Sequence, residues 1–149
     1  MADKVFNVAL GRAAHYATLP AASDALVVIV LEAADLVSDA TMVDYDNVAA
    51  ILAGASTEQT TMGRKTVTSG VSVTVDDDAN DVVIEFPDQT WIEATGGPVG
   101  ALVIAYDPDT TGGTDADLIP LVKLDCALTP DGSDVTVRFD DGIYAASED

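Results

Sequence analysis

The sequence predicts a mainly β protein, an antiparallel β-sandwich or barrel with one short α-helix. In the second half of the chain, runs with strand character recur about every eight to twelve residues, separated by Gly, Pro and Asp, a spacing typical of these folds. Helical periodicity occurs in one brief stretch. The chain has 149 residues, 48% of them apolar. We therefore expect a single domain over residues 1–149 with its own core.

The amino-terminal part of the chain is expected to be extended. Residues 4–10 place Phe6, Val8 and Leu10 in alternation with other residues, which predicts a strand or an extended arm. Residues 1–12 are therefore a candidate docking arm, since an extended segment can add to the edge of another sheet.

The next apolar run covers residues 25–31 and consists mostly of Val and Ile, so it is expected to be a fully buried strand. Residues 32–36 either extend this strand or turn helically, and periodicity alone does not decide between the two.

The helix is expected over about residues 45–54. Its apolar stripe consists of Val48, Ile51 and Leu52. Asp44 or Asp46 is expected to cap its start, and Gly54 lies where a helix commonly ends. Such a short helix is stable only when it packs on a sheet.

A β-hairpin is predicted over residues 71–86. Val71, Val73 and Val75 alternate with polar residues, and a second alternating run covers residues 82–86. Residues 76–81 between them are rich in Asp, which tolerates tight turns.

Further strands are expected at residues 64–69, 90–94, 99–106, 118–128, 134–139 and 143–145. Residues 99–106 are apolar throughout, so this strand is expected at the centre of a sheet. Pro120 places the start of its strand at an edge or a bulge. Turns are expected at residues 96–98, 130–132 and 141–142.

The charge balance limits the choice of partners. Twenty-six acidic residues face six basic ones, a net charge of −20. This charge repels nucleic-acid phosphates and anionic lipid surfaces, so we expect neither nucleic acid nor membrane as a partner. Three explanations of the strong negative charge stay open: solubility, a halophilic source and positively charged partners.

The location of the protein is predicted from apolar segments. The longest apolar run, residues 25–31, is far shorter than a membrane span, and the first twelve residues lack signal-peptide features. We therefore expect a soluble protein made in a cytoplasm.

Few residues point to catalysis, and we expect no enzyme, no catalytic residues and no cofactor. His15 is the sole histidine, and no G-x-S-x-G motif accompanies it. Cys126 is the sole cysteine and is expected to be a small buried hydrophobe. Trp91 is expected in the core and not as a sugar platform. An acid/base pair of Asp residues stays open.

Binding motifs are also weak, and we expect no metal. The loop at residues 107–117 carries carboxylates that suit Ca²⁺ but does not match an EF-hand, so a solvated acidic turn is favoured. The acidic residues 76–78 with Asp81 are a similar case. Residues 96–100 are Gly-rich without a phosphate-binding motif and are expected to form a turn. For Arg64 and Lys65, an ordinary strand start and an ion pair between subunits both stay open.

Several short segments of the sequence are typical of one protein family. They are Arg64–Lys65–Thr66, VTVDD at 73–77, PDQTW at 87–91, YDPDTTGGTDADLIPL at 106–121, LTPDGSDVT at 128–136, Tyr144, the opening MADKVFNVALGR and the segment DYDNVAAILAG. With these strings the chain resembles the minor capsid or head-decoration proteins of tailed phages that infect actinobacteria. Lys123 and Leu124 stand where the family pattern has a pair of histidines, which removes the basis for a metal or pH role there.

The resemblance implies a structural virion protein on the outside of the capsid. It implies the major capsid protein as a partner, attachment at joints between capsid subunits, and a homotrimer. Two alternatives stay open: a head–tail connector or tail component, and a Ca²⁺-dependent surface binding module.

Overall fold

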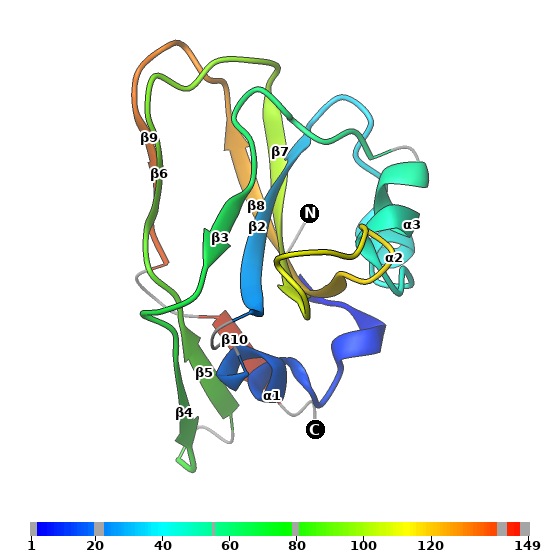
Figure 1. Cartoon of the computed structure of the whole chain (residues 1–149), viewed down its shortest axis with the longest axis vertical. Coiled ribbons are helices and arrows are strands. Elements are labelled where there is room, and N and C mark those ends of the chain that lie inside the picture. The colour runs from blue at the N-terminus through cyan, green and yellow to red at the C-terminus, as the bar shows by residue number, and fades with distance from the viewer. Residues whose placement is uncertain (1–2, 20–22, 55, 79–80, 140–142, 147–149) are drawn as a thin grey trace.

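The chain folds around antiparallel β-sheets, as the sequence predicts. The computed structural model describes residues 3–19, 23–54, 56–78, 81–139 and 143–146 (Figure 1). Within these residues lie a five-stranded sheet in the order β1-β8-β7-β2-β3, a three-stranded sheet β10-β5-β4 and the pair β6-β9. The mainly β fold class, sandwich-like with short helices, is confirmed.

The bounds of the elements follow the chain. The strands are β1 (Lys4–Val5), β2 (Ala25–Glu32), β3 (Lys65–Val67), β4 (Ser72–Asp76), β5 (Asp81–Glu85), β6 (Gln89–Trp91), β7 (Val99–Asp107), β8 (Ile119–Leu128), β9 (Val135–Val137) and β10 (Ile143–Ala146). The helices are α1 (Ala13–Thr18), α2 (Asp39–Met42) and α3 (Val48–Ala53), with a 3₁₀ turn, η1 (Asn7–Ala9). The turn expected at residues 141–142 lies outside the described residues.

The two central strands, β2 and β7, are buried on both faces. Opposite residues such as Ile29 and Val103, or Val28 and Ile104, pair across them. One face packs on α2 and α3 and the other on α1 and the smaller sheets (Figure 1). Nearly every position of these strands is buried, apart from Glu32, Gly100 and Asp107, so both strands are apolar without alternation over most of their length, although the sheet is antiparallel. The central strands at residues 25–31 and 99–106 are therefore confirmed.

The predicted helix is present as α3 but is shorter than expected. Its cap is Asn47, whose Oδ1 accepts a hydrogen bond from the backbone N–H of Ala50 (2.8 Å). The expected cap at Asp44 or Asp46 is wrong, and Asp44 instead accepts from the Asn7 amide (2.6 Å). Asn has the same short acceptor geometry as Asp, so composition alone does not choose between neighbouring caps.

Two further helices, α1 and α2, were not predicted. They have six and four residues, and each buries one or two side chains, so neither shows an apolar stripe like that of α3. Residues 32–36 do not become a helix: β2 ends at Glu32 and a turn follows. No helix among the described residues has the length and apolar character that a membrane-spanning helix needs.

The amino-terminal segment folds onto its own sheet. Lys4 and Val5 pair with Lys123 and Val122 of β8, and Phe6 is completely buried. The strand expected over residues 4–10 stops at Val5, and η1 follows. The expectation of an extended arm is therefore corrected for residues 3–9. Burying the Phe6 ring in the core is more favourable in free energy than leaving it exposed to water.

Pro120 lies at the predicted bulge. The register between β7 and β8 shifts between Ile104 and Ala105, where Ala105 faces Pro120. Pro has no N–H to donate, so a bulge accommodates it without breaking a ladder bond. Just beyond it, the Leu121 carbonyl accepts the N–H of Phe6 (3.1 Å), which continues the edge made by β1.

Candidate functional surface

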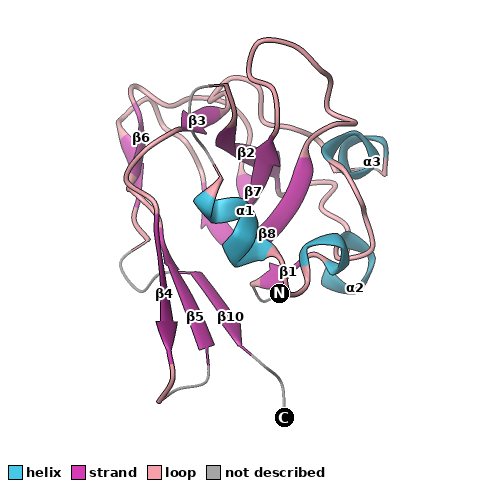
Figure 2. Ribbon diagram, turned by 60° about the horizontal axis from the view of Figure 1, so that its bottom comes forward, coloured by secondary structure: helices cyan, strands magenta, loops and turns pink. Residues whose placement is uncertain are grey.

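The sheet β10-β5-β4 extends from the body as a separate blade (Figures 1 and 2). The predicted hairpin is confirmed: Val73 faces Ile84, and Val75 faces Val82. Residues 79–80 of its loop lie outside the described residues.

The tip of this blade carries an uncovered apolar side chain. Val71 and Val73 are half-buried against α1 and the core, while Val75, on the same face, is 66% exposed. The strand alternates as predicted, but the sheet runs past the part of the body that covers this face. β4 is also an edge strand among the described strands, so its outer backbone groups face away from the sheet.

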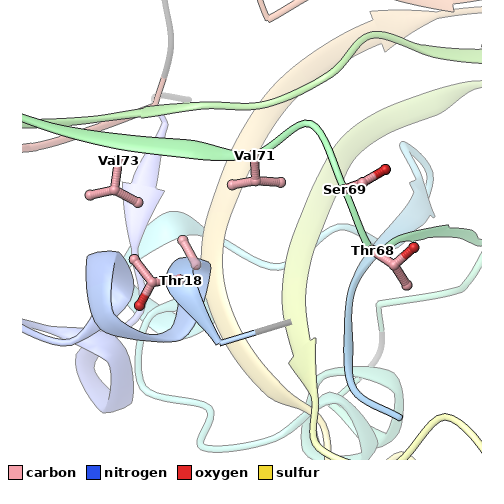
Figure 3. Close-up of a pocket in the computed structure, with 6 residues that line it drawn as sticks. Thr18, Thr68, Ser69, Val71 and Val73 are labelled. Atoms are coloured by element: carbon pink, nitrogen blue, oxygen red, sulfur yellow. The ribbon is translucent and has the colours of Figure 1, made fainter. Parts of the chain in front are cut away.

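A groove separates β4 from α1 (Figure 3). It has a volume of about 240 Å³ and is lined by Ala17, Thr18, Thr68, Ser69, Val71 and Val73. None of the described residues that line it has an ionisable side chain. Ligand pockets are commonly about 300–1,000 Å³, so this groove suits one or two side chains of a partner better than a cofactor.

Helix α1 is held beside the groove by an aromatic stack. The Tyr16 ring lies on the Tyr106 ring with 5.3 Å between centroids, and the Tyr106 hydroxyl donates to Asp24 Oδ2 (2.8 Å). His15, the sole histidine, lies in this helix and is exposed. Its ring contacts the ring of Tyr16, its neighbour in the chain.

The acidic loop at residues 107–117 uses its carboxylates to hold its own turns. Asp107 accepts the N–H of Asp109, and Asp109 accepts the N–H and hydroxyl of Thr111 (3.0 and 2.7 Å). Asp117 accepts the N–H of Thr114 (2.8 Å). The hydrogen bonds from Thr111 and its N–H keep the pKa of Asp109 below its ordinary value. In the part of the chain that the structure describes, no group of three or more His, Cys, Asp or Glu residues is arranged to hold a metal ion.

Arg64 binds within its own chain. Its guanidinium donates to both Glu58 oxygens (2.7 Å each) and to both Asp115 oxygens (2.6 and 3.1 Å). These bonds raise the pKa of Arg64, and they lower that of Asp115. The hypothesis of an intersubunit ion pair at Arg64 is therefore replaced by an intrachain clamp. Its neighbour Lys65 lies over the Trp91 ring, 5.4 Å from the ring centroid.

Lys123 is a feature to which the sequence assigned no role of its own. Its side chain is only 1% exposed, and its Nζ contacts carboxylate oxygens of Asp39 and Asp125. Desolvation lowers the pKa of Lys123, but the hydrogen bonds to both carboxylates outweigh it and raise the pKa. The sequence contains one sign of this ion cluster, a lysine within the otherwise apolar run 121–124. A charged side chain that is buried in such a run needs charged or hydrogen-bonding partners.

Trp91 and Cys126 both belong to the hydrophobic core or pack against it. Trp91 is buried, as predicted, and its Nε1 donates to the Gly63 carbonyl (2.9 Å). Cys126 is half-buried beside the core, and burial raises the pKa of its thiol, which disfavours the reactive thiolate.

The Gly-rich segment bends the chain at residues 96–97, but the turn expected over residues 96–100 is too long, because β7 begins at Val99. Gly96 has φ of 121°, and the buried Gln59 amide occupies the space that a Cβ there would need. Gln59 Nε2 donates to the carbonyls of Thr95 and Gly97 (3.0 and 3.3 Å), so the turn surrounds a side chain of its own protein.

Comparisons of this chain with protein-family models, with curated proteins and with solved structures give no match.

Proposed function

We propose that this chain is a structural virion protein that binds the outer surface of a tailed-phage capsid and stabilises joints between major capsid subunits. The sequence strings that resemble head-decoration proteins give the class of protein, and the blade β10-β5-β4 gives a surface through which it can act. In this proposal the partners are the major capsid protein and two further copies of the chain in a homotrimer.

The observation that carries the proposal is the uncovered face at the tip of the blade. Val75 is one of three large hydrophobic side chains among the described residues that are largely exposed, with Leu10 and Ile92. It alone lies on an edge strand of a sheet that extends from the body (Figure 2). An edge strand with an apolar face can add to or pack on a partner sheet.

Charge supports a partner surface with basic groups. Two of the six basic residues, Arg64 and Lys123, are each bound to two carboxylates of the same chain. Asp76 and Asp78 flank the tip of the blade and are exposed. Contact with a basic surface would reduce the repulsion among the carboxylates of this chain, and it would speed the association of the two proteins.

Avidity makes a small contact sufficient. We expect contact through the blade tip alone to bury less than the roughly 800 Å² per partner of a standard interface. In a trimer, three blades bind one shell together, and linked binding raises the apparent affinity well above that of one contact.

The proposal is tested by binding the purified protein to shells that lack it. Val75→Asp replaces the apolar side chain at the tip with a carboxylate that would have to lose its water in the contact, and it does not open the core, so we expect about tenfold or greater loss of affinity with an unchanged melting temperature. Ile92→Asp is the matched control, because Ile92 is equally exposed (68%) but lies beyond β6, away from the blade. It should bind like the wild type.

Leu10→Asp separates the blade from the amino-terminal segment. Leu10 is 60% exposed and follows η1. If Leu10→Asp abolishes binding and Val75→Asp does not, the amino-terminal segment is the docking element and the blade is not. If none of the three variants nor the wild type binds shells, the virion role is wrong.

A further inference from the structure

Lys123 lies on the buried face of the central sheet, in a row of apolar side chains. It pairs with Val103 of β7, which pairs in turn with Ile29 of β2. Cross-strand partners share a face, so Lys123 faces the same layer as Met42 and Phe6, which are both completely buried. A primary amine is thus held away from water in a packed core.

Two carboxylates approach this amine from different elements. Asp39 Oδ1, in the first turn of α2, lies 3.0 Å from Lys123 Nζ. Asp125, two residues further along β8 on the same face, also contacts Nζ through its Oδ1. The Asp39 side chain is 18% exposed and that of Asp125 33% exposed, so Asp125 keeps more contact with water.

We propose that Lys123 and Asp39 form an intramolecular isopeptide bond, with Asp125 as the group that transfers protons. The proposal concerns the folded chain itself and does not depend on the virion role. The bond would join α2 covalently to β8, across 84 positions of sequence.

The reaction balances as a condensation. Asp125 accepts a proton from the Lys123 ammonium and passes it to a carboxylate oxygen of Asp39, and the neutral amine attacks Cγ of Asp39. The C–N bond forms, and a second proton moves from nitrogen through Asp125 to the departing oxygen. The C–O bond then breaks and one water molecule leaves. Asp125 ends as the carboxylate that it was at the start, and nothing is oxidised or reduced.

The geometry favours this step in two ways. Holding amine and carboxyl in contact gives an effective concentration far above that of free groups. Burial also makes the charged ammonium and carboxylate groups costly in free energy, because both have lost water. The amide replaces these two charged groups with one neutral group. The two hydrogen-bonded carboxylates resist loss of the ammonium proton, so the reaction is expected to be slow and to follow folding.

Mass spectrometry of the denatured wild-type chain tests the proposal directly. The expected result is a mass lower by one water than the sequence requires. A proteolytic peptide should connect the segments that contain residues 39 and 123. Lys123→Arg and Asp39→Ala should restore the full mass, and Asp39→Asn should lose one ammonia instead, because the amide nitrogen then departs.

Asp125→Ala tests the proton-transfer role. It should retain the full mass while Trp91 fluorescence shows a folded core, since Trp91 is buried on the face of the central sheet opposite Lys123. If Asp125→Ala still loses one water, Asp125 has no part in the reaction. If the wild-type chain keeps its full mass after prolonged incubation in the folded state, no isopeptide bond forms and the three residues are only an ion cluster.

Discussion

At the scale of single residues, the few basic side chains connect distant parts of an acidic chain. Arg64 joins the loop before β3 to Asp115, which is 51 positions away. The sequence marks Arg64 as unusual because bases are rare, but it cannot show the partner, since a contact over 51 positions depends on the folded topology. For the same reason the sequence does not show that Asp39 lies beside Lys123, because the two residues are 84 positions apart.

The Arg64 clamp leads to a stability prediction. Arg64→Gln leaves Glu58 and Asp115 without their charged donor, and Arg64 is only 28% exposed. We expect the free energy of unfolding at pH 7 to fall by about 1–2 kcal/mol, measured by urea denaturation. Arg12→Gln is the control, because Arg12 is exposed, and its effect should stay within about 0.5 kcal/mol.

The effect should depend on pH through Asp115. Arg64 lowers the pKa of Asp115 in the folded state, so this carboxylate contributes stability above its unfolded pKa of about 4 and loses it as the pH falls through the lower folded value. The difference between wild type and Arg64→Gln should therefore be full at pH 7 and shrink below about pH 4. A difference that stays constant down to pH 2 would contradict the clamp.

At the scale of elements, the sequence predicts strands well where burial is uniform or strictly alternating. The central strands and the hairpin are found where they were expected because their patterns follow the two faces of a sheet. The extended conformation expected at the amino terminus is wrong for residues 3–9, because alternation over a few residues does not show which sheet a terminal segment joins. The blade was foreseen as a hairpin, but its projection from the body depends on tertiary packing.

The folded amino-terminal segment gives the second stability prediction. Phe6→Ala removes a completely buried ring and should lower the free energy of unfolding by about 3–5 kcal/mol. Leu10→Ala is the control, because Leu10 is mostly exposed and should change stability little. Both are measured by urea denaturation with Trp91 fluorescence. Equal and small effects of the two changes would mean that the segment does not belong to the core.

At the scale of the whole molecule, the fold is a body with a blade attached to it and a strongly negative charge. If the blade docks on a basic surface, attraction between the two should weaken as salt screens it. We expect binding to shells to fall steadily as the ionic strength is raised from about 0.05 to 0.5 M, while the melting temperature of the free protein stays constant or rises, because salt also screens the repulsion among its own carboxylates. Binding that is unchanged or stronger at high salt would point to an apolar contact alone.

The proposed virion role is tested most directly by the number of copies of this chain per particle, measured by quantitative mass spectrometry of purified virions of the phage that is proposed to encode it. A decoration protein should be present at a copy number close to that of the major capsid subunit. A handful of copies would indicate a connector or tail component, and complete absence from the particle would contradict the account.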